Sequence, residues 1–142
     1  MNSDSGDRYP GSSRAVGDLG EPPTARDWGR PTQYRVGGVL TDFYTIGQLA
    51  VALNRSPVTI RKWERLGIIP VAAFRAPAEV KAKARRLYSR AQLEIMVGIA
   101  WDEGLMRFTR GEDGRDHAFA HVTETHFSER VQAAFQKLAG AA

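Results

Sequence analysis

Apolar residues recur with helical spacing shortly after Tyr44. Thr45 precedes the stripe and Gln48 follows three residues later, the spacing of a capping box, which satisfies the free amides at a helix start. Four apolar residues stand at positions i, i+3, i+4 and i+7 on one side of this helix: Ile46, Leu49, Ala50 and Leu53. The pattern predicts a short helix with one face in a core.

A second helix is predicted directly after the first. Asn54-Arg55 interrupts the apolar stripe, and Ser56-Pro57 is a favoured helix start, because Ser caps free amides and Pro is tolerated at the first helical position. Gly67 is the expected left-handed residue at the helix end. The turn between the two helices is therefore about three residues long.

The two sides of the second helix differ in character. Ile60, Trp63 and the aliphatic stem of Glu64 are expected to face the core. The outward side carries Val58, Thr59, Lys62 and Arg65, with Arg61 at the boundary. A short helix, a tight turn and a second helix with an outward cationic face form a helix-turn-helix, in which the second helix enters the DNA major groove.

The segment after Pro70 has the pattern of a basic wing. Residues 71–74 and 85–88 can form strands, and a stretch poor in apolar residues lies between them. A hairpin there would place its cations beside the sugar-phosphate backbone, where they contribute affinity. The cations concerned are Arg75, Lys81, Lys83, Arg85 and Arg86. Ser89 then caps a third helix that ends near Gly104.

The expected fold class is mainly α: a winged helix-turn-helix with a short β-hairpin wing over residues 43–106, a disordered N-terminal arm and a C-terminal amphipathic helix. The arm is residues 1–42, of which eleven are Gly or Pro. Its last part, ARDWGRPTQYRV, mixes cations with aromatic residues. A plain linker is the favoured interpretation; the alternatives are an arm in the minor groove and docking through Trp28 and Tyr34.

The C-terminal region is expected to be a loop over residues 107–124 and an amphipathic helix with its tail over residues 125–142. That helix has one apolar stripe, and the third helix has a second apolar strip. The residues concerned are Ile95 and Ile99 on the third helix and Val131, Phe135 and Leu138 on the last. The two strips are expected to pack within one chain; a homodimer through them is the alternative and would read a repeated half-site.

Positive charge is concentrated in the segment with the helix-turn-helix pattern. Residues 43–90 hold ten Lys or Arg against two Glu, a net charge of +8, whereas residues 1–42 carry −1 and residues 91–142 carry −3. A basic segment between slightly acidic flanks is the electrostatic pattern of a polyanion-binding surface. Double-stranded DNA is therefore the expected partner.

These motifs together resemble the DNA-binding domain of the MerR superfamily, and related small phage and excisionase-type proteins. The resemblance rests on YTIGQLA at 44–50, on SPVTIRKWER at 56–65, on GIIP at 67–70 and on RLYS at 86–89. It implies that Thr59, Arg61 and Lys62 contact DNA, that Tyr88 contacts a phosphate, and that Trp63 is a partly buried anchor. The family's long dimerising helix and effector domain have no counterpart here, so no small-molecule effector is expected.

Other chemistry is not indicated. His117, His121 and His126 lie close in sequence, but without Cys and without an HExxH pattern they do not predict a metal site. Gly37-Gly38 lacks the Lys-Ser/Thr of a phosphate-binding loop. We expect no cofactor and no catalysis. No apolar run is long enough to cross a membrane and no signal peptide opens the chain, so a cytoplasmic or nucleoid location is expected.

Three functions remain open. The first is a sequence-specific DNA-binding protein, a transcriptional regulator or recombination accessory factor of phage type, that uses a recognition helix at 57–66 and a basic wing at 71–88. The second is the DNA-recognition subunit of a phage packaging complex, similar to an oligomeric small terminase. The third is a protein-interaction module without a role on DNA.

Overall fold

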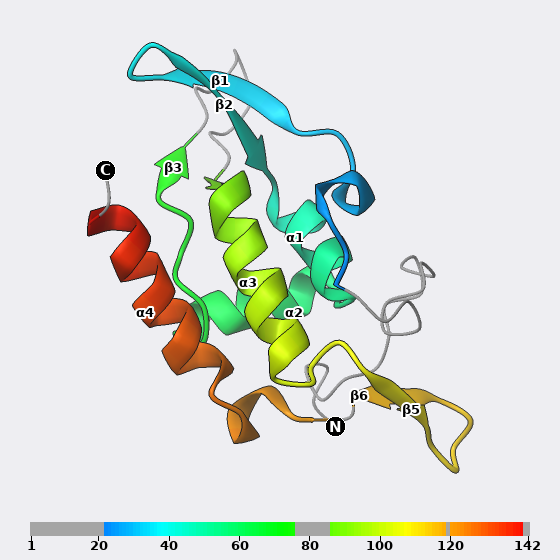
Figure 1. Cartoon of the computed structure of the whole chain (residues 1–142). Helices are drawn as coiled ribbons and strands as arrows, with labels where there is room; N and C mark the ends of the chain where they lie inside the picture. Colours follow the sequence, from blue (N-terminus) through cyan, green and yellow to red (C-terminus); the bar gives the residue numbers. More distant parts are fainter. Residues whose placement is uncertain (1–21, 76–85, 119, 141–142) are drawn as a thin grey trace.

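A four-stranded antiparallel sheet packs against helices in the computed structural model of the chain, which describes residues 22–75, 86–118 and 120–140 (Figure 1). The strands are β1 (Thr32–Val36), β2 (Val39–Tyr44), β3 (Phe74–Arg75) and β4 (Arg86–Ser89), in the spatial order β1-β2-β4-β3. The α-helices are α1 (Ile46–Leu53), α2 (Pro57–Arg65), α3 (Arg90–Asp102) and α4 (Phe127–Gly140).

The expected fold class is wrong, because the described chain mixes α and β structure and is not a mainly α protein with one short hairpin. Half of the sheet, β1 and β2, comes from residues expected to lie mostly in a disordered arm. The cause is Gly37-Gly38, whose φ angles of 58° and 82° form a two-residue turn between two strand-capable runs. Gly-Gly between such runs is a hairpin signal.

Trp28 fixes the start of the described chain to the core, so a plain linker is also the wrong interpretation here. The short 3₁₀ helix η2 (Ala25–Trp28) buries this indole, which meets Tyr44 edge-on with ring centroids 5.5 Å apart. Docking through Trp28 was the less favoured alternative.

The three predicted helix starts are confirmed. Thr45 and Ser89 each form a capping box, with Gln48 and Gln92 respectively, and the Ser56 hydroxyl accepts from the Thr59 amide ahead of Pro57. Each cap satisfies amides that the first turn leaves without a partner, which is why these helices begin at residues readable from the sequence.

A second hairpin forms where a loop was expected. Strands β5 (Phe108–Arg110) and β6 (Asp116–Ala118) pair antiparallel, and the 3₁₀ helix η3 (Val122–Glu124) leads into α4. Gly111 tolerates no side chain, since an added Cβ would lie 2.7 Å from the His117 ring. The close turn at Gly111 therefore lets the two short strands meet.

Helix α4 completes the core from the far end of the chain. Phe127 and Val131 are buried in the same cluster as Trp63, and the rings of Trp63 and Phe127 lie 5.7 Å apart. Gln132 Nε2 donates to the Gly67 carbonyl at 3.1 Å, and Arg130 bridges to Asp102 and Glu103 at the end of α3. Helix α4 therefore packs on α3 and on the end of α2 within one chain.

Candidate nucleic-acid interface

The turn between α1 and α2 is held from inside by Arg55. Asn54 takes the left-handed conformation with φ of 57°, and the chain reverses over residues 54–56. The Arg55 guanidinium is buried, donates to the Leu53 and Leu105 carbonyls at 3.1 and 2.9 Å, and lies 5.8 Å from the Trp63 ring centroid. Arg55 therefore fixes the turn to the segment after α3 and adds nothing to the charge of the surface.

Helix α2 has one buried and one exposed side. Ile60 and Trp63 are at most 1% exposed, which confirms the predicted core side and makes Trp63 a fully buried anchor. Val58 is 64% exposed, Arg61 and Arg65 are also exposed, and Lys62 is half-buried. We call Val58, Arg61 and Arg65 the α2 face; it holds two cations and no carboxylate, because Glu64 points inward.

Thr59 was predicted to project outward, and this is wrong. Its side chain is 1% exposed, and its hydroxyl lies 3.1 Å from that of Ser56. The reason is position: Thr59 stands four residues before Trp63 and so shares its side of the helix. Thr59 supports the helix start and is not available on the α2 face.

Glu64 ties the buried side of α2 to the sheet. Its carboxylate accepts from the Tyr88 hydroxyl at 2.6 Å and from the Ala72 amide at 3.3 Å, and pairs with the Arg86 guanidinium at 3.2 Å. A buried carboxylate is stabilised only when such partners surround it. This cluster therefore holds α2 in a defined position against β4.

Tyr88 was expected to contact a phosphate, and the structure contradicts this. The side chain is fully buried on β4, and its hydroxyl lies within hydrogen-bonding distance of Glu64 and of the Pro70 carbonyl. Burial raises the pKa of Tyr88 well above its usual value, and the hydrogen bond to Glu64 adds to the rise. Its role is internal.

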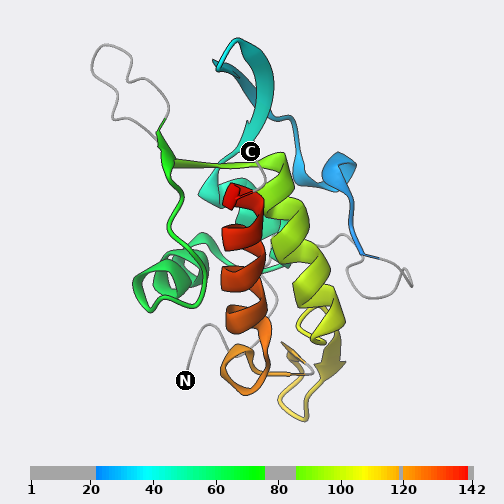
Figure 2. The same ribbon diagram turned by 60° about the vertical axis from the view of Figure 1, so that its left-hand side comes forward.

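The wing cations divide into three groups. Arg75 on β3 is exposed, whereas Arg86 on β4 is partly exposed and paired with Glu64. Lys81, Lys83 and Arg85 lie outside the described residues. Figure 2 shows β3 and α2 along the same side of the molecule, so Arg75 extends the exposed positive charge of the α2 face toward the sheet.

Charge elsewhere on the described surface is largely compensated. Arg90 pairs with Glu94 at 3.3 Å and lies 4.0 Å from Asp42, and Arg130 pairs with Glu103 and Asp102. Arg61, Arg65 and Arg75 make no such ion pair within the described residues. The basic character counted from the sequence therefore appears at the surface along α2 and β3.

The strips considered for a dimer lie mostly inside the chain. Val131 is buried in the core, and Ile99 and Phe135 pack against it. Ile95 and Leu138 are half-buried. The intramolecular alternative is thus what the structure shows for Val131, Ile99 and Phe135.

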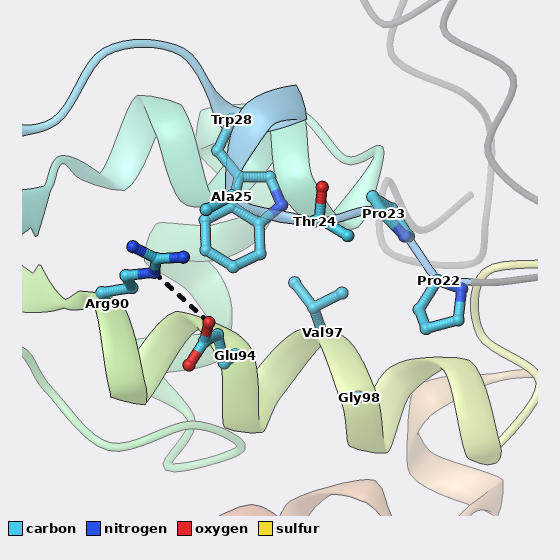
Figure 3. Close-up of a pocket in the computed structure, with 9 residues that line it drawn as sticks. All are labelled: Pro22, Pro23, Thr24, Ala25, Trp28, Arg90, Glu94, Val97 and Gly98. Atoms are coloured by element: carbon cyan, nitrogen blue, oxygen red, sulfur yellow. Dashed lines mark hydrogen bonds and ion pairs between the residues drawn. The ribbon is translucent and has the colours of Figure 1, made fainter.

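Two shallow depressions lie away from the α2 face. One, of about 320 Å³, is lined by Pro22, Pro23, Trp28 and the α3 residues Arg90, Glu94, Val97 and Gly98, among others (Figure 3). Its two charged residues pair with one another, so they do not converge on a ligand. The other, of about 580 Å³, lies between β2 and the ends of α3 and α4 and is open.

The histidines form isolated pairs within the described part of the chain. His117 lies 3.1 Å from Asp113 and His126 lies 3.1 Å from Glu129, and no third metal ligand joins either pair among the described residues. No helix among those residues has both the length and the apolar character needed to cross a membrane.

Comparisons of this chain with protein-family models, with curated proteins and with solved structures give no match. The function is therefore argued from the residues themselves.

Proposed function

We propose that the protein binds double-stranded DNA by inserting the α2 face into the major groove. The observation that supports this best is the division of α2: Ile60, Trp63 and Glu64 anchor one side, while the opposite side exposes two arginines and no acid. The major groove admits an α-helix, and a helix that follows a tight turn presents its outward side chains to base edges.

Each exposed side chain has a chemistry that fits this role. Arg61 and Arg65 can donate two hydrogen bonds to the O6 and N7 atoms of guanine or can bind phosphate oxygens. Val58 is apolar and suits a thymine methyl group. Arg75, at the strand beside the helix, suits a backbone phosphate, and we extend the same role to Lys62, Lys81, Lys83 and Arg85.

The biological role proposed is that of a transcriptional regulator or recombination accessory factor in the cytoplasm or nucleoid. The resemblance of residues 44–89 to MerR-superfamily DNA-binding domains supports it. Among the described residues, neither depression gathers the converging polar groups of an effector site.

The test is selection of bound sequences from a random pool of duplex DNA, with the full chain and three variants. We expect a consensus for the wild type. Arg61→Ala and Val58→Ala should each relax the preference at particular positions, by about 1–3 kcal/mol for a direct base contact. Lys137→Ala, which removes an exposed cation from α4, is the matched control and should leave the consensus unchanged.

Enrichment of no sequence, with no measurable binding to any duplex at low salt, would refute the proposal. A consensus that Arg61→Ala and Val58→Ala leave intact would show that DNA is read by another part of the chain.

A further inference from the structure

Strand β1 is an outer strand of the sheet, and its far edge is open among the described residues. Its only strand partner there is β2, and Figure 1 shows the hairpin of β1 and β2 standing at the margin of the sheet away from α4. Gln33 and Arg35 are both exposed. An outer strand with unpaired amides and carbonyls is a template for pairing with another chain.

The register of the hairpin determines which backbone groups face outward. Val36 and Val39 flank the two-residue turn and are paired, so Val36, Tyr34 and Thr32 bond toward β2. The alternate residues, Gln33 and Arg35, therefore direct their amide and carbonyl groups to the open edge. Those two residues can make the four bonds of a short antiparallel pairing.

We propose that β1 pairs antiparallel with β1 of a second copy of this chain, with Tyr34 on the two-fold axis. In this register Gln33 lies opposite Arg35 of the other copy, so both outward residues of each strand are hydrogen-bonded. An axis at Arg35 would oppose two arginines and use Gly37 of the turn; an axis at Gln33 would use Pro31, which has no amide hydrogen.

The side chains on the sheet face away from the helices support the same register. Tyr34 belongs to an aromatic cluster, with ring centroids 6.2 Å from Phe43 and 5.7 Å from Phe74, and Phe43 stacks on Phe74 at 4.1 Å. Pairing at Tyr34 places the tyrosines of the two copies side by side. The two aromatic clusters then join into one ridge across the axis.

The pairing is independent of the proposed function but has a consequence for it. A two-fold axis at Tyr34 relates two α2 faces, so a DNA site read by the dimer would be an inverted repeat. Because a five-residue edge contributes few bonds, the dimer should be weak and dependent on concentration.

The first test measures the mass in solution of the full chain over micromolar to millimolar concentrations. Gln33→Arg opposes two cations twice across the axis and should weaken dimerisation roughly tenfold. Within the monomer the new side chain can still donate to Asp42, as Gln33 does at 2.7 Å, so the melting temperature should not fall. The double variant Gln33→Arg/Arg35→Glu restores opposite charges and should dimerise again.

The second test uses the absence of cysteine from the sequence. Tyr34→Cys puts one thiol of each copy on the axis, at the Cα separation of a disulfide, and should cross-link under mild oxidation. Thr32→Cys faces Val36 of the other copy and should not. A wild type that stays monomeric, a dimer that Gln33→Arg leaves unchanged, or equal cross-linking by the two cysteine variants would each overturn the proposal.

Discussion

The Tyr88 hydroxyl and the Glu64 carboxylate meet at 2.6 Å in the interior, beneath the helix proposed to read DNA. Glu64 belongs to α2 and Tyr88 to β4, so this contact joins the helix to the strand that pairs with β3. Arg86 closes the cluster from the partly exposed side. The position of the α2 face relative to Arg75 thus depends on a buried polar contact.

Tyr88→Phe should destabilise the fold by about 1–3 kcal/mol, because it leaves a buried carboxylate short of one donor. Chemical denaturation measures this. Tyr34→Phe, the same change on the half-buried outer face, is the control and should cost little. If Tyr88→Phe instead kept full stability and lost DNA affinity, the tyrosine would be a contact with DNA after all.

Alkaline titration should separate the buried tyrosines from the others. Burial raises the pKa of Tyr88 and of Tyr44 above the ordinary 10.0. A raised folded pKa gives stability that is present below pH 10.0 and is lost as the pH rises further, because the unfolded chain ionises more readily. Tyrosinate absorbance of these two residues should therefore appear only together with loss of near-ultraviolet circular dichroism. Full ionisation with the fold intact would contradict the assignment.

Glu103 should make the fold sensitive to acid. The His126 backbone amide and then the Arg130 guanidinium lower the pKa of Glu103 below the ordinary 4.5. A lowered folded pKa gives stability that is present above pH 4.5 and is lost as the pH falls through the folded value.

Glu103→Gln should therefore be less stable than the wild type at neutral pH, and the two should converge in acid. Glu124→Gln, at an exposed carboxylate, is the control and should follow the wild type at every pH. A constant difference between Glu103→Gln and the wild type down to low pH would show that packing, and not charge, explains the loss.

Trp63→Ala should unfold or strongly loosen the protein. Truncating a buried aromatic residue costs about 3–5 kcal/mol, a large part of the stability of a small domain. Thermal melting followed by circular dichroism measures it, and Trp63→Phe should retain part of the stability. Should Trp63→Ala melt like the wild type yet fail to bind DNA, the indole would have to reach DNA.

The helix-turn-helix could be predicted because its signals are local. Caps at Thr45, Ser56 and Ser89 and the left-handed Gly67 act within one helical turn of the residues they serve. The inward side of α2 was equally readable, since Ile60 and Trp63 follow helical spacing.

The errors concern contacts between distant segments. Tyr88 is buried because Glu64, 24 residues earlier, takes its hydroxyl, and Arg55 because Leu105, 50 residues later, accepts from it. Neither pairing leaves a periodic trace in the sequence. The hairpin at Gly37-Gly38 did have a local signal, which was weighed only as a phosphate-binding loop.

The dependence of DNA affinity on salt tests the central claim most directly. Each phosphate contact contributes about 0.9 to the slope of log affinity against log salt concentration. The account predicts tight binding at low salt for the wild type, a slope smaller by up to about two units for Arg61→Ala/Arg65→Ala, and an unchanged slope for Lys137→Ala. No binding by the wild type, or equal affinity and slope for the double variant, would contradict it.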